Sequence, residues 1–159
     1  MTRRFLIGTC LAFGVAVISA QSASVRITGP RSVVLSAADL AAMPRVTVTA
    51  PAHDRTATYE GVSLRDLLTR VGVPAGEALR GRDLAAAVIV MGADGYRVAF
   101  GVAEFDPGFT DRVAILADKR NGAPLTADEG PFQLVLTGEK RPARWVRQVT
   151  SIDVQVVGR

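Results

Sequence analysis

Cysteine and histidine are almost absent from this chain of 159 residues. The one cysteine, Cys10, lies in an apolar run near the N-terminus, and the one histidine is His53. A single cysteine cannot form a disulfide within the chain, and a single histidine excludes a multi-histidine metal site. If the N-terminal run is removed, thiolate chemistry is excluded as well.

Aromatic residues and nucleotide-binding motifs are also scarce. Aromatics make up 6% of the chain, with a single tryptophan. There is no GxSxG nucleophile elbow and no GxxxxGK[ST] phosphate loop. Binding of nucleic acid by stacking needs several aromatics and a broad basic face. We therefore rank nucleic acid last among the partners and expect none.

The first residues have the plan of a secretory signal peptide. Arg3 and Arg4 form a charged start, and an apolar run to Ile18 follows before small residues. The run is short for a membrane span, which needs about 20 apolar residues. We expect cleavage after Ala20, with Ala23 as the alternative site, and an uncleaved anchor as the second alternative.

The expected organisation is a signal peptide over 1–20 and a single domain over 21–159, periplasmic or secreted, with no stable membrane insertion after cleavage. The adjacent arginines suit either a twin-arginine signal, which serves proteins exported in folded form, or an ordinary one. The remaining chain is long enough for one domain with its own core.

Positive charge is concentrated near the C-terminus. The net charge is +4, and five cations face only two acids from Gly138 onward. The stretch GEKRPARWVR places four cations around the tryptophan, namely Lys140, Arg141, Arg144 and Arg147 around Trp145. Three interpretations are open: solvated charges at a strand edge, a nucleic-acid surface, or a focused site for a small anion, since guanidinium groups bind phosphate in pairs of hydrogen bonds.

Short apolar patterns, interrupted by Gly, Pro, Asp and Asn, predict many strands and few helices. The expected strands are 24–29, 31–35, 45–50, 56–61, 85–92, 96–101, 112–118, 132–138, 144–149 and 151–157. The expected helices are 36–44 and 63–72, each with a capping-box pattern at its start. The strand at 85–92 is almost entirely apolar, which predicts burial on both faces. Together these patterns predict an α+β fold with mainly antiparallel or mixed sheets.

Three polar residues outside the basic stretch are candidates for ligand contact. Asp94 and Tyr96 belong to ADGY, which is typical of a hairpin turn and also suits the edge of a pocket. His53 lies in the polar stretch APAHDRT. It is interpreted either as an exposed loop histidine or as a hydrogen-bond donor to a ligand.

Three pieces, in this order, resemble a known family: YEGVSLRDLL, then LADKRNGAPL with EGPFQLVLTG, and finally RPARWVRQVTSIDV. The chain resembles the oxidoreductase molybdopterin-binding domain of sulfite oxidases, plant-type nitrate reductases and periplasmic methionine-sulfoxide-reducing molybdoenzymes, over roughly residues 46–154. The resemblance implies a sulfite-oxidase-like fold of layered mixed and antiparallel sheets with a few short helices. It also implies a pterin phosphate cofactor that carries molybdenum.

The resemblance also assigns roles to residues. Arg144 and Arg147 match the basic positions near the pterin and its phosphate, and Trp145 takes a slot where sulfite oxidases often have histidine. The ADGY region lines the cofactor side in relatives. The candidate cofactor-binding residues are therefore Arg144, Arg147, Trp145, Arg141, Lys140, Tyr96, Asp94 and His53.

The chain departs from the family at the metal. Relatives bind molybdenum through a cysteine just before the YEGV strand, where this sequence has Ala50. The chain is also shorter than the catalytic members. Three hypotheses follow.

One is a module that binds molybdopterin or a similar small anion without thiolate-ligated catalysis, with molybdenum doubtful. The other is a periplasmic molybdopterin oxidoreductase with a non-cysteine metal site. A third is a non-binding accessory of a membrane redox partner.

Overall fold

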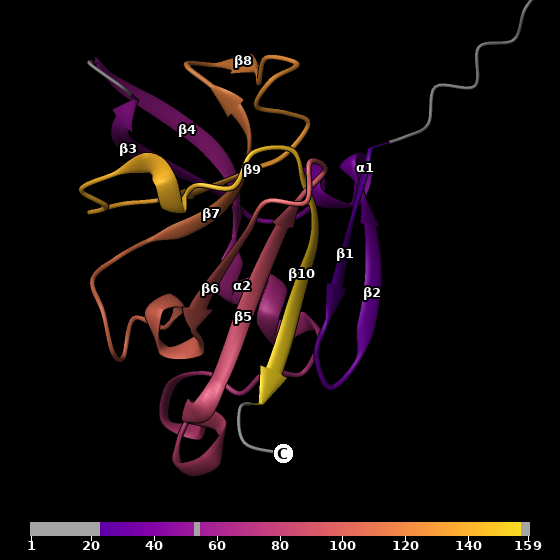
Figure 1. Ribbon diagram of the computed structural model, residues 1–159, viewed down its shortest axis with the longest axis vertical. Coiled ribbons are helices and arrows are strands. Elements are labelled where there is room, and N and C mark those ends of the chain that lie inside the picture. The colour runs from indigo at the N-terminus through magenta and orange to yellow at the C-terminus, as the bar shows by residue number, and fades with distance from the viewer. Residues whose placement is uncertain (1–22, 53–54, 157–159) are drawn as a thin grey trace, which may run out of the picture.

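The computed structural model of the chain describes residues 23–52 and 55–156. His53 and the expected signal peptide lie outside these residues. Two β-sheets with a few short helices make up the described part (Figure 1). No helix within it is long and apolar enough to cross a membrane.

The first sheet has five strands in the order β2-β1-β10-β5-β6. Its strands are β1 (Ser24–Thr28), β2 (Ser32–Ser36), β5 (Ala86–Gly92), β6 (Arg97–Gly101) and β10 (Val149–Val156). β1 and β10 run parallel, and the other neighbours are antiparallel. The sheet therefore joins the two ends of the described chain at its centre.

The second sheet follows the order β3-β4-β7-β8, and β9 also pairs with β7. Its strands are β3 (Arg45–Ala52), β4 (Arg55–Ser63), β7 (Ala114–Arg120), β8 (Ala123–Pro124) and β9 (Gln133–Leu136). All pairs are antiparallel. The register of β4 against β7 shifts between Glu60 and Gly61, which marks a bulge.

The helices are short. They are α1 (Ala37–Ala41), α2 (Leu64–Arg70) and the 3-10 turns η1 (Gly76–Ala78), η2 (Gly81–Ala85), η3 (Val102–Phe105) and η4 (Pro142–Arg144). The predicted capping box at Ser36 forms with Asp39. The one predicted at Ser63 was wrong: its side chain makes no capping hydrogen bond. Ser63 is the last residue of β4 and pairs with Ile115, so its backbone still belongs to the sheet.

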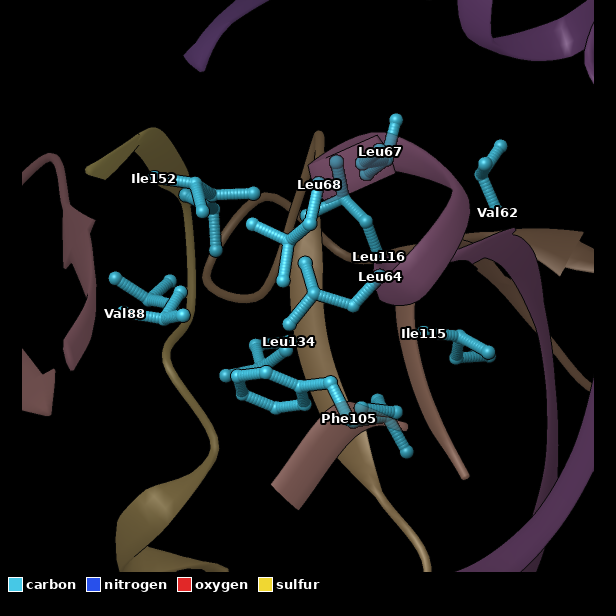
Figure 2. Packing of buried hydrophobic residues seen from close by; sticks show 14 of the residues in the cluster. Val62, Leu64, Leu67, Leu68, Val88, Phe105, Ile115, Leu116, Leu134 and Ile152 are labelled. Atoms are coloured by element: carbon cyan, nitrogen blue, oxygen red, sulfur yellow. The ribbon is translucent and has the colours of Figure 1, made fainter. Parts of the chain in front are cut away.

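The core lies between the two sheets and is filled by α2. Leu64, Leu67 and Leu68 are buried, as the i, i+3, i+4 spacing predicts. Figure 2 shows Leu68 between Ile152 of the first sheet and Leu116 of the second. These contacts set the separation of the sheets and so fix the segments that cross between them.

Two sequence predictions about strands were wrong. β5 is not buried on both faces: its side chains alternate between buried and half-buried. Residues 144–148 do not form a strand, because Arg144 ends η4 and Gln148 has a positive φ of 48°. A residue in that left-handed region interrupts a strand, so β10 begins only at Val149.

Candidate functional site

Two adjoining hollows open beside η4 and share Pro142, Trp145 and Arg147. The outer hollow has a volume of about 310 Å³ and is completed by Asp94, Tyr96 and Ala143. The inner hollow has a volume of about 30 Å³ and is completed by Tyr59, Arg120, Glu129 and Gln133. We call the two together the cleft. It brings residues of β4, β7 and β9 next to the basic segment.

The chain from Trp145 to Val149 is held on both sides by backbone hydrogen bonds. On one side the N–H of Gln148 donates to the carbonyl of Glu129 at 2.9 Å, and that of Val149 to Phe132 at 2.8 Å. On the other side the N–H of Ala93 donates to the Gln148 carbonyl at 3.0 Å. A segment with its main chain tied on both sides has little freedom, so the backbone that carries Arg147 has a fixed position.

A buried aromatic pair lines the inner hollow. Trp145 is 6% exposed and meets the Tyr59 ring edge-on, with centroids 5.5 Å apart. This T-shaped contact is a favoured arrangement of aromatic rings. Burial raises the pKa of the Tyr59 hydroxyl, although the Arg120 guanidinium works against this shift. Tyr59 therefore stays neutral at physiological pH.

Arg120 is neutralised inside the cleft. Its Nη1 lies 2.6 Å from Oε1 of Glu129, whose other carboxylate oxygen accepts from Thr126 at 3.2 Å. Two other polar atoms, Oε1 of Gln133 and Nε1 of Trp145, belong to residues that line the inner hollow, and they are buried without a hydrogen-bond partner among the described residues. A buried polar group left unpaired costs about 1–3 kcal/mol. A guest that reached these two atoms would meet one acceptor and one donor.

The structure separates the two arginines that the sequence grouped together. Arg147 is exposed, lines both hollows and makes no ion pair with the described residues. Arg144 points elsewhere: its guanidinium binds Glu139 at 2.9 Å and Glu104 at 2.8 Å, and lies over the Phe100 ring at 4.4 Å. It does not line the cleft. Arg147 is therefore the cation that the cleft can offer to an anion.

Asp94 and Tyr96 belong to a hairpin turn and also border the outer hollow. Gly95 has a φ of 83° and the Asp94 carboxylate accepts the N–H of Tyr96 at 2.9 Å, which closes the hairpin turn. The Tyr96 hydroxyl donates to the carbonyl of Ala143 at 2.6 Å, across the outer hollow. The turn and η4 are thereby tied together at the cleft's rim.

The other candidates lie apart from the cleft or outside the described residues. Lys140 and Arg141 are exposed and line neither hollow. His53 lies outside the described residues. The four cations of the basic stretch thus lie in different environments, and Arg147 is the one that borders the cleft.

Sequence reasoning missed four residues of the inner hollow, namely Tyr59, Arg120, Glu129 and Gln133. Arg120 and Glu129 fall outside the strands and helices that the sequence predicts. All four fall within the pieces that carry the family resemblance. Their polar character in otherwise apolar or turn-forming stretches was the available signal, but their meeting depends on how β4, β7 and β9 pair.

A family model described as oxidoreductase molybdopterin binding domain matches residues 12–157. The chain belongs to this family. No protein with a curated description matches it. Among solved structures, the sulfane dehydrogenase SoxCD from Paracoccus pantotrophus is similar with a TM-score of 0.65 and 21% identity, over 84% of this chain and 39% of that chain.

These findings confirm the predicted α+β, sulfite-oxidase-like molybdopterin-binding fold. At this identity the likeness to SoxCD concerns the fold alone. This member of the molybdopterin-binding family spans only 39% of the SoxCD chain. What the longer protein does is therefore not transferred to it.

The described residues of this family member contain no group of three His, Cys, Asp or Glu side chains that could hold a metal. Ala50, where the sequence comparison placed the family's cysteine, is buried in β3 opposite Ala57 of β4. A methyl group cannot ligate a metal. The residues that border the cleft offer hydrogen-bonding groups and the Arg147 cation.

Proposed function

We propose that this domain binds molybdopterin, or a similar small anionic ligand, in the cleft, and that it does so without a metal-ligating thiolate of its own. One observation carries the proposal: an exposed arginine lies beside two buried polar atoms, and none of the three has an ionic or hydrogen-bond partner among the side chains of the described residues. Arg147 suits a phosphate. Gln133 and Trp145 suit the acceptor and donor edge of a heterocycle.

The sizes of the hollows decide how such a ligand fits. A cavity needs roughly 10–15 Å³ to hold one water. The inner hollow, at about 30 Å³, is therefore too small for a ring and takes only an exocyclic polar group. The outer hollow, at about 310 Å³, has room for the ring system between Tyr96 and Trp145. The residues fit the organic part of the cofactor in this orientation.

The residues do not supply a fixed position for the metal. In the family's cofactor, molybdenum bound by the dithiolene of the pterin provides the redox chemistry. In this chain the proposed roles are to bind and orient: Arg147 holds the anionic end, while the amide of Gln133 and the indole N–H of Trp145 hold the exocyclic polar group that enters the inner hollow. Asp94, also in the outer hollow, disfavours an anion placed on its side of the cleft.

We further propose that the domain is exported and works in the periplasm or outside the cell. The charged and apolar start of the sequence supports this. A membrane redox partner is proposed as the protein that the domain serves if the ligand carries electrons. Mass measurement of the protein recovered from the periplasm, against the mass of the full chain, tests removal of residues 1–20.

The direct test is the content of the protein as purified from a molybdenum-replete host. We expect about one released fluorescent pterin per chain and molybdenum well below that ratio, because the domain that remains after removal of residues 1–20 has no cysteine to ligate the metal. Stoichiometric molybdenum would overturn the expectation that the domain holds the pterin largely without its metal, and would favour the oxidoreductase alternative. Absence of both pterin and metal would overturn ligand binding.

Arg147→Ala is expected to weaken binding of neopterin monophosphate at least tenfold, because a hydrogen bond to a charged group contributes about 1.5–3 kcal/mol. The loss should shrink at high salt, which screens an exposed charge. Trp145 is the only tryptophan and borders both hollows, so quenching of its fluorescence reports occupancy directly. Equilibrium dialysis provides an independent measure of the same affinity.

Two matched variants control this measurement. Arg141→Ala removes a nearby exposed charge that does not line the cleft, and should leave the affinity within about twofold. Arg144→Ala should lower the melting temperature, because it leaves Glu104 and Glu139 without this partner, yet leave the affinity nearly unchanged. If Arg144→Ala weakened binding as much as Arg147→Ala, the assignment of Arg147 as the anion contact would be wrong.

A further inference from the structure

The first sheet has one face packed on the core and one face that no described element covers. In Figure 1, β5 and β10 lie in front of α2, with no helix or strand between them and the viewer. The side chains of this outer face follow from the registers of the four strand pairs. They include Val34, Arg26, Ser151, Met91 and Arg97 in one row across the strands, and Ser32, Thr28, Asp153, Ile89 and Ala99 in the next.

The outer face has an apolar stripe along β5, which is unusual for a sheet face in water. Where one side of an antiparallel sheet is solvated, the outward positions are normally polar. In β5, however, the outward residues Ala87, Ile89 and Met91 are apolar and only half-buried. On the edge strand β2, Val34 is 58% exposed. The sequence of β5 predicts burial on both sides, and the described chain buries only one.

Two opposite charges on this face lack partners within the described chain. Arg26 and Asp153 lie in adjacent rows of neighbouring strands, since Arg26 pairs with Ser151 and Asp153 is two residues further along β10. Neither takes part in an ion pair among the described residues; the Asp153 carboxylate accepts only the Ser151 hydroxyl at 2.9 Å. Next to Arg26 a hollow of about 310 Å³, bordered also by Val34 and Met91, lies open on the face.

We propose that a second copy of this chain covers the outer face of the first sheet, in a twofold-symmetric dimer. In an isologous interface each contact occurs twice with its partners exchanged. The twofold axis lies in the plane of the interface and passes midway between Arg26 and Asp153, at right angles to the line that joins them. It therefore pairs Arg26 of each copy with Asp153 of the other. One face carries both charges, so the face is complementary to itself. The apolar side chains of Ile89 and Met91 then lie beside the paired charges and are buried in the interface.

Sedimentation equilibrium of the exported protein, over a wide range of micromolar concentrations, tests this proposal. We expect a reversible dimer, and Ile89→Glu is expected to shift it to monomer by at least tenfold in dissociation constant. The matched control is Phe109→Glu, at an apolar residue that is 50% exposed outside both sheets, which should leave the dimer intact. Circular dichroism verifies that each variant is folded.

A charge exchange tests the geometry of the dimer. Arg26→Asp and Asp153→Arg should each weaken association, since like charges then face each other, and the double variant should restore it. A wild-type protein that stays monomeric at every concentration overturns the proposal. So does a dimer that Ile89→Glu leaves unchanged. Failure of the double variant to recover overturns the twofold pairing of Arg26 with Asp153.

Discussion

Replacing Gly61 by alanine is expected to destabilise the domain by roughly 3 kcal/mol, at the upper end of what overpacking costs. Gly61 sits at the bulge where β4 meets β7. A Cβ atom there would lie 2.6 Å from the Cα of Ala117 and closer still to the carbonyl oxygen of Leu116. Both are backbone atoms of a buried strand, so neither can move without breaking the ladder.

The effect of Gly61→Ala should extend to the cleft. Tyr59 is two residues before Gly61 in the same strand, on the other side of the bulge, and it pairs with Arg120 of β7. A shift of β4 against β7 therefore displaces the ring on which Trp145 packs. We expect a lower urea midpoint together with an altered emission of Trp145 in the folded protein. Both changes are read from one titration.

Gly101→Ala is the matched control for this prediction. Gly101 also lies in a strand, has a φ of −70°, and a Cβ atom there would meet nothing within 4 Å. The substitution should be neutral or slightly stabilising, because alanine restricts the unfolded chain. Equal stability of the Gly61 and Gly101 variants would show that the close approach at Gly61 relaxes without cost.

Local patterns predicted most strands and helices of the fold because those patterns act over a few residues. The β-branched run of β3 and the leucine spacing of α2 are examples, and both elements form where expected. β5 shows the limit. Its apolar run does not specify whether both faces are covered, since that depends on which other chain segments, or other molecules, reach the outer face.

The candidate site was predictable only in part, for a similar reason. The sequence located the basic stretch and the ADGY turn, and the structure places Trp145, Arg147, Asp94 and Tyr96 around one hollow. The sequence alone could not show that Arg144 and Arg147 lie in different environments. That separation depends on Glu104, 40 residues away in sequence from Arg144, which binds its guanidinium. Ion pairs between distant segments leave no periodic signal in a sequence.

Asp106→Asn is expected to lower stability at neutral pH by about 1.5–3 kcal/mol, the range for hydrogen bonds to a charged group. The buried Asp106 carboxylate accepts the N–H of Gly76 at 2.6 Å and that of Gly108 at 2.8 Å. Arg65 lies 3.6 Å away. An amide retains one acceptor oxygen and turns an N–H₂ group towards a backbone donor, so one of these bonds is lost and a repulsion is added.

The pH dependence identifies the charge as the cause. The Gly76 N–H, with smaller contributions from Gly108 and Arg65, lowers the pKa of Asp106 below its usual value, against the opposing effect of burial. An aspartate in an unfolded chain titrates near pH ~3.9. The stabilisation is therefore complete above that pH and is lost as the pH falls through the lower pKa of the folded state. Urea titrations of the two proteins should differ most at neutral pH and converge in acid.

Asp111→Asn, at an exposed carboxylate without an ion pair among the described residues, should run parallel to the wild type throughout. A difference for Asp106→Asn that stayed constant down to strongly acidic pH would assign its effect to shape rather than to charge.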